Sequence, residues 1–296
     1  LGTQALRDST TAARCVAIGT SALQGNTTGF ENTAVGANTL SVSTTTSYHT
    51  AIGYGALNAN TTGVGNTAVG HGSLVANTGG GSNNAFGAAS LDANTNGNSN
   101  TAMGQNALGA NTTGSNNTAM GDDAASAITT GSQNTFLGKS SQGITTGSNN
   151  TTIGFEAATT SVSVSNEFTL GNGSISNLRC NDTSISSLSD ARDKTNVQDI
   201  PLGLDFVNQM RPVSFDWDRR DGSYKGKKDF GFIAQELKEI QDNTAYAAHM
   251  RLVRDENPEK LEADPMKTYP VLVKAIQELS AKVEELQTEI KTLKGN

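Results

Sequence analysis

The sequence predicts a mostly β N-terminal half, built as a 17-residue-repeat β-solenoid or β-roll, and an α+β C-terminal domain that ends in a long helix. Three observations support this. An apolar residue followed by glycine recurs every 17 residues from Gly19 to Gly138. Residues 1–185 hold 12 charged side chains and no proline, although the whole chain has 21 Lys and Arg, 28 Asp and Glu and five Pro. Near the C-terminus, apolar residues alternate at spacings of three and four, which is typical of a coiled-coil helix.

The repeat is the strongest of these signals. Ten copies align on the glycine, and only the step from Gly138 to Gly154 is one residue short. Several copies share Asn-Thr-Ala-apolar-Gly, and six successive copies have Leu four residues after the glycine. A short fixed period predicts stacked coils, each too small to bury its apolar side chains alone. We expect roughly two short strands per coil, joined by Gly- and Asn-rich corners suited to positive φ.

The strand residue before each glycine is expected to form the core. Stacking would align Val35, Ile52, Val69, Phe86 and Met103 in one apolar row. Alternate strand positions are Ala, and small residues there suggest a face where neighbouring chains approach closely. Because a thin roll with few aromatic residues has little core of its own, we expect a homotrimer packed around an axis. The strict register disfavours disorder, which the composition alone would permit.

Composition also excludes several classes of partner. The formal net charge is −7 and no basic run occurs, which argues against nucleic acid and anionic membrane surfaces. No apolar stretch approaches the ~20 residues of a membrane span. The three His show no ligand spacing, so we expect no metal and no cofactor. Cys15 and Cys180 are expected to be two separate thiols. The N-terminus is no signal peptide and lacks Met, so we expect further sequence upstream of residue 1.

The repeats leave no room for an active site, because no coil carries a long insertion. The adjacent pair Asp122 and Asp123 is interpreted as a solvated corner and not as glycosidase carboxylates. The glycosylation sequons at Asn26, Asn60 and Asn111 are interpreted as by-products of Asn-Thr-Thr corners.

These patterns define three segments. Residues 1–172 form the repetitive shaft, 173–188 a connecting strand or linker of alternating polarity, and 189–296 the C-terminal domain. We expect the aromatic residues of this domain to form its core: Phe206, Phe215, Trp217, Phe230 and Phe232. Segment 230–234 is expected to be a strand that enters a helix at 235–241.

A helix at 270–294 is expected to close the chain. Its seam consists of Ile276, Leu279, Val283, Leu286, Ile290 and Leu293. β-branched residues at one seam position with Leu at the other favour two strands in isolated parallel coils. The seam therefore leaves two alternatives open: the helix packs onto its own domain, or a trimer is imposed from upstream.

Four motifs of the C-terminal domain resemble a known family. In order and spacing, segments 189–197, 203–207, 210–217 and 229–237 are similar to the auto-processing intramolecular chaperone domain of phage tail spikes, endosialidases and fibres, which also has a relative in a membrane-bound eukaryotic transcription factor. The repeats resemble those of viral and phage fibres and, more weakly, the left-handed β-roll coils of trimeric autotransporter adhesin heads. The resemblance implies trimerisation, assisted folding of the shaft and release by self-cleavage.

Ser189 and Lys194 fall where this family places its serine–lysine dyad. A serine hydroxyl needs a base, and lysine can serve if burial or nearby cations lower its pKa. Five residues of separation could join the side chains across a turn or between chains. The alternative makes Ser189 a helix N-cap, with Asp190 in the first turn and Lys194 solvated. Phage relatives imply cleavage between Ser189 and Asp190, although the Leu188–Ser189 bond would suit an N→O acyl shift; Asp190 and Asp193 receive no catalytic role.

The expected function is therefore a virion tail fibre or spike, assembled in the host cytoplasm, with a single-turnover autocatalytic endopeptidase attached. Expected partners are two further copies, a host-surface receptor or glycan, and other tail proteins contacted through upstream sequence. Two alternatives remain: a bacterial trimeric surface adhesin, which would need a C-terminal membrane anchor, and the non-catalytic stem of a polysaccharide-degrading tailspike.

Overall fold

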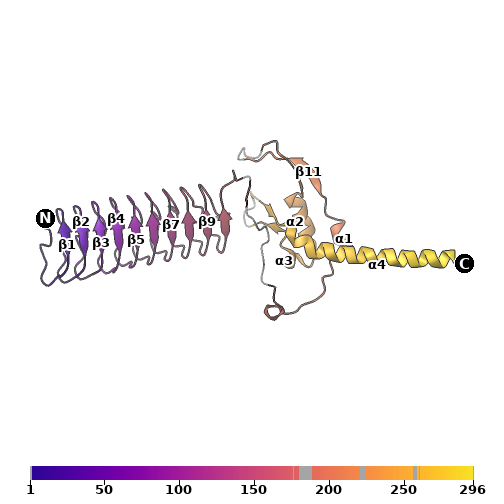
Figure 1. Ribbon diagram of the computed structural model, residues 1–296, viewed down its shortest axis with the longest axis horizontal. Coiled ribbons are helices and arrows are strands. Elements are labelled where there is room, and N and C mark those ends of the chain that lie inside the picture. Colours follow the sequence, from indigo (N-terminus) through magenta and orange to yellow (C-terminus); the bar gives the residue numbers. More distant parts are fainter. Residues whose placement is uncertain are drawn as a thin grey trace. The chain divides into compact units, whose positions relative to one another are not determined.

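The computed structural model describes residues 2–175, 177–179, 189–220, 225–255, 259 and 261–295. The chain divides into two compact units, Leu1–Ile175 and Ser176–Asn296. The first is a β-solenoid, and the second is a small α+β region that ends in a long helix (Figure 1). This architecture confirms the predicted fold class.

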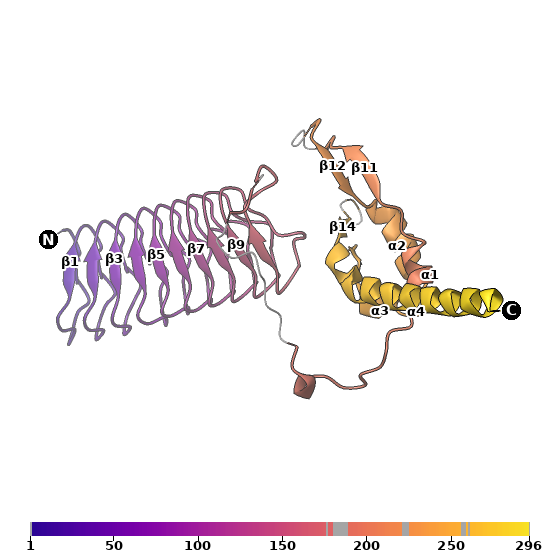
Figure 2. The ribbon, with the colours of Figure 1, turned by 45° about the vertical axis from the view of Figure 1, so that its right-hand side comes forward.

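Each coil of the solenoid contributes one three-residue strand, and the strands stack in parallel in sequence order (Figure 2). They are β1 (Val16–Ile18), β2 (Thr33–Val35), β3 (Thr50–Ile52), β4 (Thr67–Val69), β5 (Asn84–Phe86), β6 (Thr101–Met103), β7 (Thr118–Met120), β8 (Thr135–Leu137), β9 (Thr151–Ile153) and β10 (Phe168–Leu170). The prediction of two strands per coil was wrong. In the described coils the opposite side is made of turns, which hydrogen-bond from coil to coil, as in Leu57 N–H to Ser73 O at 3.1 Å.

The core lies on the Ala side of the strands, so the predicted core row was wrong. Ala34, Ala51 and their successors are fully buried together with the Leu row that runs from Leu23 to Leu108. Ile52 and Met103 point outward and are 39% and 40% exposed. Successive strand residues face opposite sides, so only one of the two rows can enter the coil. The coil is narrow, and Ala is the side chain that fits beside the Leu row at native packing density.

Buried asparagines form the polar half of the core. In one row, the Asn83 backbone N–H donates to Asn66 Oδ1 at 2.9 Å, and the Asn83 side-chain amide donates to Gly97 O at 2.8 Å. The same pair of bonds recurs at Asn100 and Asn117. These asparagines satisfy backbone groups that the three-residue strands leave unpaired.

A second asparagine row contains the three sequon residues. Asn60, Asn77, Asn94 and Asn111 are joined by side-chain amide bonds of 2.8 Å. Asn26 lies one coil beyond Ser43, where the row is interrupted. All of them are fully buried, so none of these amide nitrogens is accessible for glycosylation in the folded shaft. This agrees with their interpretation as structural by-products, although they lie inside the coil and not at a left-handed corner.

After residue 200, the second unit contains α1 (Leu204–Val207) and a hairpin of β11 (Val213–Asp216) and β12 (Lys228–Gly231). The remaining elements are α2 (Ala234–Asp242), α3 (Ala247–Met250), β13 (Val253–Arg254), β14 (Glu262–Ala263), the 3₁₀ turn η2 (Pro265–Thr268) and α4 (Tyr269–Lys294). The predicted passage from strand to helix around 230–241 is confirmed by β12 and α2. The core of the unit comprises Phe206, Leu237, Met250, Leu252, Val253 and Val271.

The aromatic prediction holds only in part. Phe206 is buried, and Phe215, Trp217 and Phe232 are half-buried. Phe230 is 85% exposed, so its assignment to the core was wrong. It lies in a two-stranded hairpin, where one face of each strand has no covering layer within the described part of the unit. Of the predicted connecting strand 173–188, residues 173–175 and 177–179 form no strand; 176 and 180–188 lie outside the described residues.

Helix α4 packs against its own unit only at its beginning. Val271 and Ala275 are buried, whereas every described residue from Leu279 onward is exposed. The later turns extend beyond the rest of the second unit (Figure 1). The seam residues are therefore unpartnered along most of the helix, from Ile276, which is 66% exposed, to Leu293, which is 77% exposed. The alternative that the seam packs onto its own domain was wrong.

Candidate functional site

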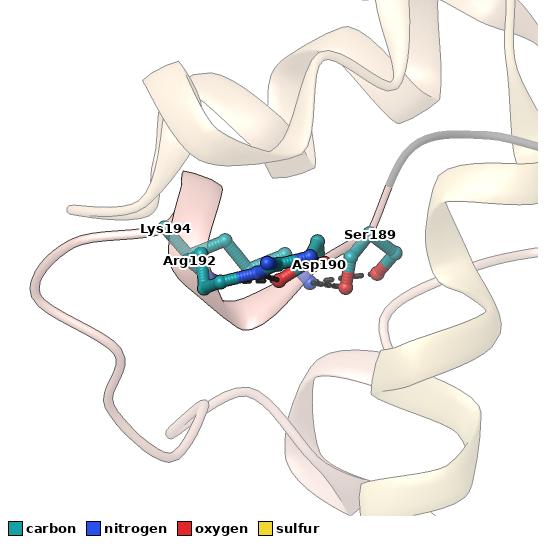
Figure 3. Close-up of polar contacts among 4 residues, drawn as sticks. All are labelled: Ser189, Asp190, Arg192 and Lys194. Carbon is teal, nitrogen blue, oxygen red and sulfur yellow. Dashed lines mark hydrogen bonds and ion pairs between the residues drawn. The ribbon is translucent and has the colours of Figure 1, made fainter.

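The candidate site is a short turn formed by residues 189–194, at the beginning of the C-terminal domain. A 3₁₀ turn, η1 (Ala191–Asp193), places Lys194 back beside Ser189 (Figure 3). Asp190 is the N-cap, and its carboxylate accepts the backbone N–H of Arg192 at 2.8 Å. Lys194 follows as the C-cap, with its backbone N–H donating to Ala191 O at 3.2 Å. An Asp at this position is a strong local signal for such a turn.

Lys194 contacts two atoms of Ser189. Its Nζ donates to the side-chain Oγ at 2.6 Å and to the carbonyl O at 3.1 Å (Figure 3). That carbonyl belongs to the Ser189–Asp190 peptide bond. The Lys194 amine therefore reaches both the Ser189 hydroxyl and the carbonyl of the peptide bond that follows Ser189. Both distances are within the usual range for hydrogen bonds.

Asp190 and Arg192 form a bidentate ion pair beside this contact. Their closest oxygen and nitrogen atoms are 2.6 Å apart. The hydrogen bond from the guanidinium holds the pKa of the Asp190 carboxyl below its ordinary value, and the carboxylate raises the pKa of Arg192. The pair occupies the Asp190 carboxylate, so Lys194 is left to interact with Ser189.

The whole segment is open to solvent. Every residue from Ser189 to Ile200 is exposed in the single chain. A lysine acts as a base only after it loses its proton, and burial or nearby cations favour that loss. The isolated chain provides the geometry of the site but no burial around it.

The structure thus places all three predicted site residues in one turn. It brings Ser189 and Lys194 together across that turn, and Asp190 lies between them as the cap. The alternative in which Ser189 caps a helix was wrong, because Asp190 fills that position. The sequence interpretation had assigned neither the cap nor the Arg192 partner, although an Asp two residues before an Arg would have suggested both.

Other parts of the described chain offer less chemistry. A pocket of about 370 Å³ in the second unit is lined by Leu202, Phe206, Asn243 and Glu278, among others. Glu278 is already engaged, since its carboxylate accepts the Leu204 backbone N–H at 2.7 Å. Among the described residues, no three His, Cys, Asp or Glu side chains gather as metal ligands. Of the helices that the structure describes, none has both the length and the apolarity to cross a membrane.

Residues 189–246 match the model of a protein family described as chaperone of endosialidase, Peptidase_S74. The match begins at Ser189 itself and includes Lys194 and the hairpin of β11 and β12. Comparisons with curated proteins and with solved structures give no match. A β-solenoid followed by a region of this family fits a tail-fibre- or tailspike-like protein with a C-terminal chaperone domain. The family implies an autoproteolytic chaperone activity.

Proposed function

We propose that the chain is a phage tail fibre or spike whose C-terminal domain assembles three copies, assists the folding of the shaft and then cuts itself off beside Ser189. The observation that carries the proposal is the contact of Lys194 Nζ with Ser189 Oγ at the first residues of the matched region. The shaft remains as the virion component, which positions or contributes to binding at the host surface.

Lys194 acts as the general base in this proposal. Once neutral, its amine takes a proton from a water that the Ser189 hydroxyl holds, and the resulting hydroxide adds to the carbonyl carbon of Ser189. The carbon–nitrogen bond then breaks, and the lysine ammonium returns the proton to the leaving amine. One water is consumed overall, its oxygen ending in the new carboxyl group.

The proposed scissile bond joins Ser189 to Asp190. Lys194 Nζ lies 3.1 Å from the carbonyl oxygen of this bond and can stabilise negative charge on it after proton transfer. Leu188, which carries the carbonyl of the alternative bond, lies outside the described residues.

Assembly would convert the open turn into an active site. The Ser189–Lys194 contact forms within one chain, but the segment is exposed on all its described residues. Neighbouring copies would bury it and thereby favour the neutral amine. Cleavage would then follow assembly, so that no chain loses its chaperone domain before its shaft is aligned.

A chaperone domain that is removed after assembly would solve the problem of aligning repetitive chains in the correct register. With a 17-residue repeat, a slip of one whole coil between chains keeps the strands at matching heights and changes only which side chains meet. Pairing between chains is also slow, because the copies must meet and align before any contact between them forms. A globular trimer at one end would fix the register before the shafts associate. Its removal would leave the fibre kinetically trapped.

The decisive experiment is the intact mass of the purified wild-type chain beside Ser189→Ala and Lys194→Ala. We expect wild type to appear as two fragments that meet at Ser189–Asp190, and both variants to stay whole. Cleavage at Leu188–Ser189 would shift each fragment by the mass of one serine residue and move the scissile bond. A wild-type chain that stays whole when assembled would overturn the self-cleavage.

The chaperone role needs a separate test. Shaft ending at Ser189 should refold to the assembled state in much lower yield than shaft produced with the C-terminal domain and cleaved afterwards. Equal yields of the same assembly would refute the role in folding and leave only cleavage.

A further inference from the structure

A continuous apolar row runs along the outer face of the strands. Each of the ten strands ends in an outward apolar residue, and these pair in register from strand to strand. The row consists of Ile18, Val35, Ile52, Val69, Phe86, Met103, Met120, Leu137, Ile153 and Leu170. All ten are exposed or half-buried in the single chain. With strands about 4.8 Å apart, the row is on the order of 45 Å long.

The face that carries this row has no charge. The other outward position of each strand is Thr in seven strands and Val, Asn or Phe in the remaining three. None of the 20 outward strand residues is Asp, Glu, Lys or Arg, although the shaft carries both signs of charge elsewhere. Depletion of charge distinguishes the cores of protein interfaces from ordinary surface. A soluble monomer rarely exposes so long an apolar patch.

The irregular coil shows that this face is kept continuous. Between Gly138 and Gly154 the repeat is one residue short, yet β8 and β9 keep the pairing of Leu137 with Ile153. The missing residue lies in the turns between Ser140 and Thr145: the Ser140 N–H donates to Asp122 O across the usual 18 residues, whereas the Thr129 N–H donates to Thr145 O across 16 residues and not 17. The irregularity therefore lies in the turns, and the register of the outer strand face is unchanged.

The occupant of this face must match its spacing. A surface that presents one apolar side chain per strand, ten times in succession, is complementary over its full length only to another surface with the same axial step. A second copy of the shaft has that step by construction. In a cyclic assembly each residue meets its own counterpart, so Phe86 would lie at the height of Phe86 in the neighbours.

We propose that the outer strand face, defined by the row from Ile18 to Leu170, is the interface between parallel, in-register shafts of the assembled fibre. For the number of copies, this inference rests on the proposed function. The outer strand face takes the place of the Ala side, which the sequence had suggested as the contact face between chains. The change in side-chain type along the row, from Ile and Val to Phe and Met and then to Leu and Ile, favours the unslipped register, because a slip pairs unequal shapes over most of its length.

Disulfide trapping in the full chain tests this interface. In a Cys15→Ser, Cys180→Ser background, Met103→Cys and Ile52→Cys should each form a disulfide between copies under mild oxidation. Thr113→Cys, on an exposed turn away from the strands, is the matched control and should stay reduced. Co-expression of Phe86→Cys and Met120→Cys chains carrying tags of different size tests the register. These two positions lie two coils, or about 10 Å, apart, beyond the reach of a disulfide.

The expected result is crosslinking at matched row positions, none at Thr113, and no mixed product from the Phe86 and Met120 chains. Mixed product equal to the matched product would refute the register, and crosslinking at Thr113 without crosslinking at Met103 would refute the face. Fragment masses from the same samples report self-cleavage independently. Chains that cleave but do not crosslink on the row overturn the interface alone; chains that crosslink but stay whole overturn the cleavage alone.

Discussion

The Nδ1 atom of His49 accepts a hydrogen bond from the backbone N–H of Asn66 at 3.2 Å. In the coils that follow, Asn side-chain oxygens occupy the equivalent position. His49 is fully buried, and burial lowers its pKa from 6.5 to about 4, outweighing the backbone hydrogen bonds that raise it. Protonation of Nδ1 would place two donors face to face. The shaft therefore carries one acid-sensitive coil in an otherwise uncharged core.

The stability of the shaft should fall in acid because of His49. Its folded pKa lies below its unfolded value, so its contribution is fully present above pH ~6.5 and is lost progressively as the pH falls toward ~4. The loss is on the order of 3 kcal/mol. Denaturant unfolding at several pH values should show this slope in wild type and a shallower slope in His49→Asn, which restores the residue of the neighbouring coils. Equal slopes in the two chains would remove His49 as the cause.

Loss of one buried asparagine should destabilise the shaft strongly. Asn83→Ala removes the acceptor of the Asn100 N–H and the donor to the Gly97 carbonyl, leaving buried backbone groups unpaired. A cost of roughly 2–4 kcal/mol is expected from these groups. Asn84→Thr, at the next residue, introduces the side chain that most other coils have at this exposed position and should be nearly neutral. Thermal or denaturant unfolding of the two variants compares them directly; similar losses would contradict the role of the asparagine row.

Two glycines with positive φ should respond differently to alanine. Gly104 has φ +139°, and an added Cβ would overlap the carbonyl of Gly121 in the next coil. Gly72 has φ +66° with open space around the added atom, so it bears only the conformational cost of about 1–2 kcal/mol. We expect Gly104→Ala to abolish or greatly reduce folded shaft and Gly72→Ala to lower the melting temperature by several degrees. Equal melting temperatures would mean that the coils can separate locally.

The sequence was sufficient to predict the repeat, the stacked coils and the C-terminal helix, because each depends on periodicity alone. It was not sufficient to orient the strand. Ala34 and Val35 lie on opposite faces of the strand whichever of the two points inward, and hydrophobicity favoured Val35 as the core residue. The deciding factor was volume: the Leu row already occupies the inside of a narrow coil, so Ala completes the core and Val35 is left outside.

The asparagines were misplaced for a similar reason. Asn is common at left-handed corners, and Asn38 and Asn106 do adopt φ near +55°. Asn66 and Asn83 instead bond across coils, which only the three-dimensional stack reveals. At the candidate site, the five-residue spacing allowed the Ser189–Lys194 contact, but proximity in sequence also allowed the capping alternative. The Asp190 cap distinguishes the two.

Lys194→Arg should abolish self-cleavage while preserving the local contact. Arginine keeps a positive charge and a donor toward Ser189, but it cannot lose its proton in a protein and so cannot act as a base. Arg192→Lys is the matched control: it also exchanges one cation for the other and should still cleave, since Arg192 pairs only with Asp190 among the contacts described here. Fragment masses over time give the result. Cleavage by Lys194→Arg would show that the residue serves as a hydrogen-bond donor and not as the base.

The α4 seam should be required for both assembly and cleavage. Leu279 and Leu286 are 50% and 57% exposed, so lysine at both positions should leave the single-chain fold intact. If the seams of several copies pack together, the two added charges become buried and unpaired, which disfavours association strongly. We expect Leu279→Lys, Leu286→Lys to sediment as a smaller species and to stay uncleaved.

The control for the seam adds the same charges two residues further along the helix. Ala281→Lys, Thr288→Lys places both lysines on the opposite side of α4 from the seam, on exposed positions. This variant should assemble and cleave like wild type, which separates the effect of the seam from that of net charge. Sedimentation velocity and intact mass on the same samples decide the matter. A seam variant that still assembles and still cleaves would show that the copies are held elsewhere, and the outer strand face of the shaft would then have to supply the association by itself.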